Sequence, residues 1–222
     1  MNLGPALPPG RRPALDGHGE IGQNRTKMPL IQIPQGRIGA IVTGLEMTNR
    51  PPPTVPPSSP LRLDRRPDLD PERYRNLFRK VGSRWLWYSR LAMDDERLRL
   101  EMAEVHVVLD PSGDEVGLLE LDFRSPGECL IRFLGLVPEL TGRGHGGWLL
   151  ARTLALAWRP GVRRVAVNTC TLDHPAALPA YLKAGFRACE RAFESFPDPR
   201  LSGLLPADCA PQIPLVRPSS PA

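Results

Sequence analysis

Residues 139–158, ELTGRGHGGWLLARTLALAW, place a glycine-rich loop directly before an apolar helix. Glycine accepts positive φ angles and allows close backbone approach, so successive amides of the loop TGRGHGG (141–147) can face phosphate oxygens. The free amides and the dipole of a helix that begins there add attraction for a diphosphate. Arg143 stands among these glycines as a side-chain partner for the same anion. A flexible surface turn before a helix is the alternative interpretation.

The segments on either side of this loop predict the other elements. Upstream strands are joined by turns too short for a crossover, so they are expected to be antiparallel neighbours. Downstream, a β-branched strand and a further strand flank a helix that Asp173 is expected to cap and that runs to about Lys183. The predicted strands are 61–65, 104–110, 115–124, 129–137, 162–170 and 185–196, and the earlier helices are 70–82 and 92–103. The order β-α-α-β-β-β-α-β-α-β predicts an α/β fold with a mixed (α+β) sheet.

Proline is concentrated at the two ends of the chain. Of 27 prolines in 222 residues, 11 lie in residues 1–58 and seven in residues 196–222. Proline lacks an amide donor and fixes φ, which disfavours long helices and central strands. The sequence therefore predicts a proline-rich, disordered extension at 1–58, one domain at 59–196 and a proline-rich tail at 197–222. We also expect translation to begin at Met47.

Composition narrows the class of protein. The chain has no run of the ~18 apolar residues that a membrane helix needs and no secretory signal. Its net charge of +5 comes from interspersed acids and bases, which is typical of a solvated surface rather than a nucleic-acid site. Its four cysteines lack metal-ligand spacing. We therefore expect a cytoplasmic protein that needs no metal and binds neither nucleic acid nor membrane.

Two other phosphate-binding motifs fit the loop poorly. Gly142, Gly144 and Gly147 match G-x-G-x-x-G, but a nicotinamide fold requires that motif after the first strand, with an acid at the end of the next strand. Here the next strand ends in Asn168-Thr169-Cys170. The P-loop pattern G-x-x-x-x-G-K-S/T is missing, so a P-loop nucleotide site is excluded.

The loop and a second motif together resemble the GNAT acetyltransferase superfamily. The loop resembles its Q/R-x-x-G-x-G/A motif, with Thr141 in place of Gln or Arg. Residues 174–186, HPAALPAYLKAGF, resemble N-x-x-A-x-x-x-Y-x-K-x-G-F, with His174 in place of Asn. The resemblance covers residues 61–196. It implies a splayed central sheet, acetyl-CoA as co-substrate and direct acetyl transfer to an amine without a covalent enzyme intermediate.

The resemblance also implies particular site residues. Tyr181 would protonate the coenzyme A thiolate; packing of the last helix onto the sheet is the alternative role. Gly135 is the expected position of a bulge that splays the sheet, and backbone amides beside it would bind the thioester oxygen. The expected acetyl-CoA-binding residues are Leu134, Gly135, Leu136, Gly142, Arg143, Gly144, His145, Gly146, Gly147 and His174. At His145 the amide, rather than the side chain, is expected to contact the ligand.

The sequence indicates the general base less clearly than the other site residues. Glu120 interrupts an apolar run, so it is a candidate base with a raised pKa, and Glu128 opens the next strand. A surface ion pair with Arg132 or Arg124 is the alternative for either carboxylate. Trp85, Trp87 and Tyr88 are candidates to line the acceptor site or to anchor the core.

The sequence thus predicts an acetyl-CoA-dependent N-acetyltransferase that acts on a primary amine of a small molecule or a peptide. A non-catalytic coenzyme A-binding sensor or interaction module on the same fold is the main alternative, and a nicotinamide enzyme is a second one. Homodimers are common among resembling proteins, so a homodimer is possible here.

Overall fold

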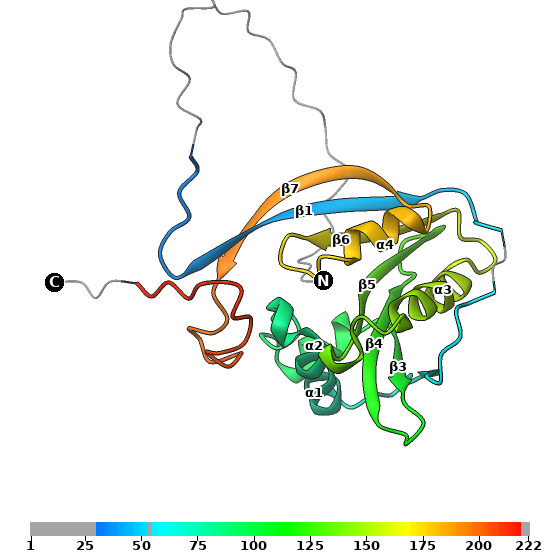
Figure 1. Ribbon diagram of the computed structural model, residues 1–222, viewed down its shortest axis with the longest axis horizontal. Coiled ribbons are helices and arrows are strands. Elements are labelled where there is room, and N and C mark those ends of the chain that lie inside the picture. Colours follow the sequence, from blue (N-terminus) through cyan, green and yellow to red (C-terminus); the bar gives the residue numbers. More distant parts are fainter. Residues whose placement is uncertain (1–29, 53–54, 219–222) are drawn as a thin grey trace, which may run out of the picture.

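A computed structural model describes residues 30–52 and 55–218 of the chain. Seven strands and four α-helices alternate along it (Figure 1). Two single turns of 3₁₀ helix, Ser83–Trp85 and Pro138–Leu140, follow α1 and β5. In chain order the elements are β1 (Arg37–Met47), β2 (Arg62–Arg65), α1 (Pro71–Gly82), α2 (Asp95–Glu101), β3 (Glu104–Leu109), β4 (Glu115–Asp122), β5 (Glu128–Leu136), α3 (His145–Ala157), β6 (Arg164–Cys170), α4 (Ala177–Lys183) and β7 (Arg187–Pro197).

The strands form one mixed sheet in the order β2-β3-β4-β5-β6-β1-β7. All neighbours are antiparallel except β5 and β6. The parallel pairing of β5 with β6 runs only from Glu128↔Arg164 to Ile131↔Val167, although β5 continues to Leu136. Beyond Ile131 the two strands separate, so the predicted splayed mixed sheet is confirmed.

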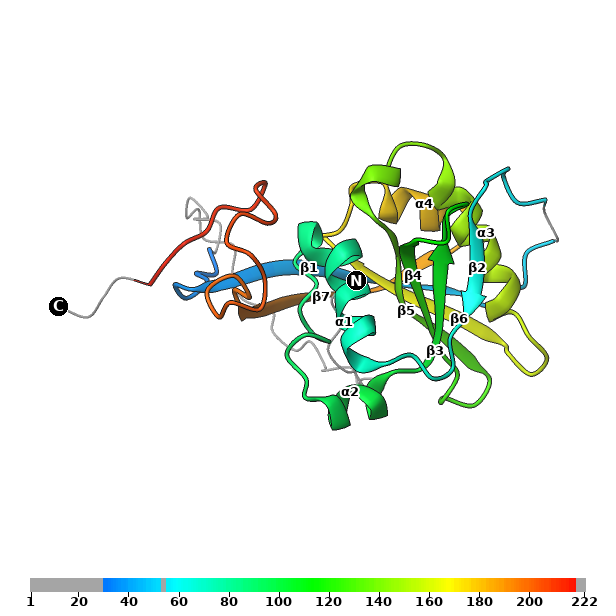
Figure 2. The ribbon, with the colours of Figure 1, turned by 90° about the horizontal axis from the view of Figure 1, so that it is seen from below.

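Helices cover both faces of the sheet (Figure 2). On one face, α1 and α2 pack over a core that includes Tyr74, Phe78 and Leu98. On the other face, α3 and α4 contribute Leu150 and Tyr181 to a second core. The separation of β5 from β6 therefore opens a passage between two helical layers.

Helix α1 begins as the sequence predicts, with Asp70 as its N-cap and Pro71 as its first residue. The Asp70 carboxylate accepts hydrogen bonds from the amides of Glu72 and Arg73, and Pro71 begins the helix. These contacts satisfy amides that would otherwise lack partners at a helix start. The expected apolar face at Tyr74, Leu77 and Phe78 is fully buried.

The prediction that the first 58 residues are irregular is wrong for β1. Residues 37–47 form an eleven-residue strand between β6 and β7, antiparallel to both (Figure 1). Ile38, Ala40, Leu45 and Met47 from this strand are buried. Ile38 and Ala40, like Leu45 and Met47, are two positions apart, which is the spacing of residues on one face of a strand. The prolines of this region lie on either side of β1, so they mask the strand pattern in the composition without interrupting the strand. Residues 1–29, which belong to the same predicted extension, lie outside the described residues.

The predicted C-terminal tail also packs against the domain. Leu205 and Ala210 are buried in the core beneath α1 and α2. The Arg200 guanidinium pairs with Asp198 at 2.8 Å and donates to the carbonyl of Ile213, also at 2.8 Å. Prolines prevent regular structure here, but buried side chains and one arginine hold the segment in place.

Candidate active site

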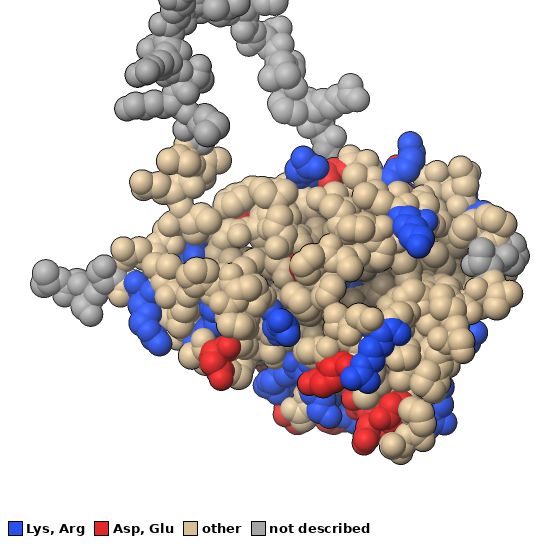
Figure 3. Space-filling view, in the orientation of Figure 1, with Lys and Arg blue, Asp and Glu red and all other residues tan. Residues whose placement is uncertain are grey.

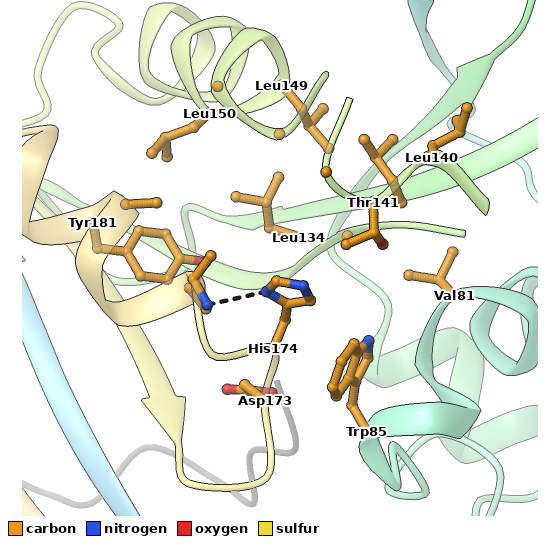
Figure 4. Close-up of a pocket in the computed structure, with 18 of the residues that line it drawn as sticks. Val81, Trp85, Leu134, Leu140, Thr141, Leu149, Leu150, Asp173, His174 and Tyr181 are labelled. Atoms are coloured by element: carbon orange, nitrogen blue, oxygen red, sulfur yellow. Dashed lines mark hydrogen bonds between the residues drawn. The ribbon is translucent and has the colours of Figure 1, made fainter. Parts of the chain in front are cut away.

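A cavity of about 320 Å³ lies where β5 separates from β6. The surface is hollowed between α3 and α4, and the side chains around the hollow are mostly uncharged (Figure 3). Its walls come from the end of α1 and the 3₁₀ turn after it, from β5, from the loop before α3, and from the α4 region (Figure 4). The sequence-predicted residues Leu134, Gly135, Leu136, Gly142, Gly144, Gly146, Gly147, His174 and Tyr181 all line it.

The glycine-rich loop leaves several backbone amides available to a ligand. Within the described residues, the amides of 142–146 donate to no protein acceptor, whereas the Gly147 amide bonds to the Gly144 carbonyl at 3.2 Å. Gly142 and Gly144 have φ angles of +77° and +82°, which favour glycine. A Cβ atom placed on Gly142, Gly144 or Gly146 would meet nothing within 4 Å. The loop is therefore open, with backbone amides free to meet a ligand, and is not a closed turn.

The expected bulge at Gly135 is absent, and a bulge lies at Arg132 instead. The register of β4 with β5 moves from Glu120↔Phe133 to Leu121↔Ile131, which leaves Arg132 as the extra residue. Gly135 has a different role: a Cβ atom there would lie 2.6 Å from Val81 and 3.2 Å from Trp87. Glycine is needed because α1 and its following turn approach β5 closely at this point.

The phenol of Tyr181 is positioned to act inside the cavity. Its side chain is 3 % exposed, packs edge-on against Phe186 with ring centroids 5.7 Å apart, and directs its hydroxyl into the cavity (Figure 4). Burial raises the pKa of Tyr181, and the negative charge of Asp173 raises it further. The hydroxyl therefore stays protonated at neutral pH and is available as a proton donor.

His174 lies on the cavity wall with one ring nitrogen already engaged. The Ala176 amide donates to Nδ1 of His174 at 3.0 Å, which leaves the proton of a neutral ring on Nε2 (Figure 4). The ring meets Trp85 edge-on, with centroids 5.2 Å apart. His174 thus presents a hydrogen-bond donor to a ligand, which agrees with a binding role and argues against one as a base.

Asp173 does not cap α4 as the sequence predicts. The structural N-cap of α4 is Ala176, without a side-chain hydrogen bond. The Asp173 carboxylate instead accepts from the Thr169 hydroxyl and from the Cys170 amide, each at 2.8 Å. Asp173 also lines the cavity, a position that its cap-like sequence context does not reveal.

Glu120 is not placed to act as a base. It is 0 % exposed and does not line the cavity. Tyr74 donates to one of its carboxylate oxygens, and Arg90 and the Ala103 amide donate to the other, with both side-chain distances 2.6 Å. Both oxygens are therefore occupied by fixed partners, and the role of Glu120 is to hold α1 and the following segment onto β4.

Glu128 is also remote from the cavity. It lies at the opposite end of β5 and pairs with Arg164 at 3.1 Å rather than with Arg132 or Arg124. Neither carboxylate singled out from the sequence lines the cavity.

The aromatic segment between α1 and α2 contributes to the cavity wall and to the core. Trp85 and Trp87 line the cavity, and Trp87 also packs against Phe78 and Phe133 in the core. Tyr88 stacks on Phe196 of β7 with ring centroids 4.8 Å apart. Val81 also lines the cavity, although nothing in its sequence context marks it, and so does Thr141 of the glycine-rich loop.

Among residues 30–52 and 55–218, no helix is long and apolar enough to cross a membrane. In the same part of the chain, no three His, Cys, Asp or Glu side chains gather where they would hold a metal ion.

Solved structures with a similar fold include proteins described as members of the GNAT class. A GCN5-related N-acetyltransferase from Sphaerobacter thermophilus aligns with a TM-score of 0.53 at 20 % identity, over 74 % of this chain and 52 % of its own. A tandem GNAT protein from the clavulanic acid biosynthesis pathway aligns with a TM-score of 0.53 at 18 % identity, over 75 % of this chain and 54 % of its own. The chain thus spans about half the length of each of these two proteins. At these sequence identities the structural likeness establishes a shared fold and nothing further.

The sequence itself carries the family signature. No curated protein matches the chain. The family model described as the acetyltransferase (GNAT) family matches residues 68–186, which include the glycine-rich loop and Tyr181. That match spans more than half of the chain and ends at Phe186. The chain belongs to the GNAT family of acetyltransferases.

Proposed function

We propose that this protein transfers the acetyl group of acetyl-CoA to a primary amine. The observation that carries the proposal is the juxtaposition of unpartnered loop amides with a cavity at the open edge of β5. The donor set fits the co-substrate, because diphosphate needs convergent N–H groups and the pantetheine arm needs a mostly apolar channel.

The loop and β5 provide binding and orientation. The amides of residues 142–146, together with Arg143, hold the diphosphate at the start of α3. Backbone groups of Leu134, Gly135 and Leu136, on the edge that β6 does not cover, pair with the pantetheine arm. His174 contributes its Nε2 proton to a carbonyl oxygen. When bound, acetyl-CoA supplies an activated acetyl carbon as a thioester.

Tyr181 acts as the general acid. The acceptor amine forms a bond to the acetyl carbon as the bond from carbon to sulfur breaks, and Tyr181 gives its proton to the sulfur. Its raised pKa keeps the phenol protonated at neutral pH, so the proton is present on the group whose hydroxyl faces the cavity. The apolar walls formed by Leu134, Leu149 and Leu150 exclude water from the thioester.

A thermal-shift titration with coenzyme A and acetyl-CoA, followed by a panel of amines, tests the proposal. A ligand at 100 times its Kd adds about 2.7 kcal/mol to the free energy of unfolding, so the melting temperature should rise by several degrees. Unchanged melting with both ligands would exclude the proposed co-substrate.

The variant Tyr181→Phe separates the enzyme from a coenzyme A-binding sensor on the same fold. An enzyme should lose roughly 10²-fold or more in kcat, the usual contribution of a general acid, and keep its affinity for acetyl-CoA. A protein with no turnover before the substitution and unchanged binding after it would be the sensor.

A further inference from the structure

The charge in the cavity comes from a single acidic side chain. Of the described residues that line the cavity, Asp173 alone is acidic, and none is a lysine or an arginine. Coenzyme A carries several negative charges on its phosphates, so a carboxylate in the cavity does not help to bind it. The charge of Asp173 therefore matches a different ligand, one that is positively charged.

The carboxylate of Asp173 is fixed in place by the end of β6. The Thr169 hydroxyl and the Cys170 amide both donate to the same oxygen, Oδ2, each at 2.8 Å. A carboxylate can accept about four hydrogen bonds, so it can hold two fixed donors and a ligand at once. Asp173 is only partly buried, which leaves the side chain within reach from the cavity. Its charge thus has a defined position before a ligand arrives, which lowers the cost of binding.

Asp173 lies at the end of the cavity that is remote from α3 (Figure 4). Leu149 and Leu150 of α3 line the opposite side, and the glycine-rich loop leads directly into that helix. The carboxylate is therefore kept apart from the diphosphate, which it would repel. After burial, the charge of Asp173 contributes to the raised pKa of Tyr181, so Asp173 acts electrostatically on the group that would protonate the thiolate.

Aromatic and apolar side chains accompany Asp173 in the cavity wall. His174, the next residue in the chain, meets Trp85 edge-on with ring centroids 5.2 Å apart. Val81 and Trp87 line the cavity from α1 and the segment after it. Such walls bury the apolar part of a ligand, and tryptophan rings also attract cations.

We propose that Asp173 binds the ammonium group of the acceptor, and that the acceptor is a primary amine with an apolar body. This inference rests on the proposed acetyl transfer and narrows its acceptor. The carboxylate supplies the counter-charge that no other side chain of the described lining offers. The apolar body of the amine lies against the wall that Val81 and Trp85 form.

The test measures binding to protein saturated with coenzyme A, which carries no acetyl group and so permits no transfer. Calorimetry compares 2-phenylethylamine, a cation at neutral pH, with 2-phenylethanol, a neutral molecule of nearly the same shape. The wild type should bind the amine about tenfold or more tightly than the alcohol, the effect of one hydrogen bond between charged groups. In Asp173→Asn this preference should disappear, while affinity for the alcohol stays at the wild-type value and affinity for coenzyme A does not fall.

Thr169→Val is the matched control for the structural role of Asp173. It removes one hydrogen bond to the carboxylate but keeps the negative charge. Asp173→Asn does the reverse, because the new amide oxygen can still accept from Thr169 and Cys170. Thr169→Val should therefore keep the preference for the amine. Equal loss of the preference in both variants would show that Asp173 acts only by shaping the end of β6.

The outcomes separate this inference from the proposed function. Failure of the wild-type protein to bind coenzyme A contradicts the proposed function, and the ammonium site with it. Binding of coenzyme A without a preference for the amine over the alcohol contradicts the ammonium site alone. If Asp173→Asn keeps the preference, the assignment to Asp173 is wrong. Weaker binding of the alcohol by Asp173→Asn would show a disturbed cavity and contradict a role confined to the ammonium.

Discussion

The Ser59 hydroxyl oxygen lies 2.9 Å from Nδ1 of His145, although 86 positions separate the two residues. His145 begins α3, and its ring is therefore held by the linker between β1 and β2 rather than turned into the cavity. Pro57 of the same linker lies near Gly147, where it would be 3.7 Å from an added Cβ atom. Residues 57–59 of the linker thus support the glycine-rich loop from outside.

Removal of that support should affect stability and coenzyme binding together. Ser59→Ala deletes two hydrogen bonds, one with Nδ1 of His145 and one from the Leu61 amide, so the free energy of unfolding should fall by about 1–3 kcal/mol. Acetyl-CoA should bind more weakly, because the start of α3 is less well fixed. Urea unfolding and calorimetry measure the two effects, with the exposed neighbour Ser58→Ala as the control. Equal acetyl-CoA affinity in all three proteins would show that the linker does not support the loop.

The buried group of Tyr74, Glu120 and Arg90 should be the most sensitive polar cluster to substitution. Glu120→Ala leaves the Arg90 charge, 3 % exposed, without its main partner, and should cost about 3–5 kcal/mol. Tyr74→Phe removes a hydrogen bond to a charged group and should cost about 1.5–3 kcal/mol. Urea unfolding gives both values. Glu128→Ala, which breaks a partly exposed pair with Arg164, is the control and should cost below about 1 kcal/mol. Similar costs for Glu120→Ala and Glu128→Ala would contradict the account of the buried group.

A protein that begins at Met47 should not fold. It lacks β1, and so leaves the facing edges of β6 and β7 without partners on the interior of the sheet. We expect a loss of the cooperative thermal transition and aggregation through the exposed edges. A protein that begins at Leu30 retains β1 and should melt like the full chain. Circular dichroism and light scattering distinguish the two, and a folded protein from Met47 onward would restore the expectation that translation starts there.

The pair of Asp198 and Arg200 should make the fold sensitive to acid. Burial tends to raise the pKa of Asp198, but the hydrogen bonds and charge of Arg200 outweigh it and lower the pKa. A lowered pKa in the folded state means that the pair stabilises the protein above the unfolded pKa of about 3.9, and that this contribution is lost as the pH falls through the lower folded value. Asp198→Asn should therefore be less stable than wild type at pH 7, and the difference should shrink toward pH 2. Thermal melts across this range test the sign, with exposed Asp208→Asn as the control. A difference that grows as the pH falls would contradict it.

Local signals in the sequence were sufficient to predict most of the fold. Asp70 and Pro71 mark the start of α1, and short turns predicted at 111–115 and 125–128 identify an antiparallel run. The glycine-rich loop was found because its chemistry is carried by residue type and spacing within a short segment, and Tyr181 was found because residues 174–186 resemble a GNAT motif. Both lie on the cavity that the fold creates.

Long-range contacts were the source of the errors. The partners of Glu120, namely Tyr74 and Arg90, lie 46 and 30 positions away, so an acid in an apolar run gave no sign that it was already paired. The strand β1 was missed because the prolines around it dominated the composition of its segment.

The position of β1 has a consequence for how the protein is made. Glu46 contacts Arg164 across 118 positions, so β1, the first strand of the described residues, finds its neighbours only after most of those residues have been synthesised. Closing so long a loop makes pairing of this kind slow. During synthesis the apolar residues of β1 must therefore remain unpaired, and the half of the sheet that contains it is expected to assemble last.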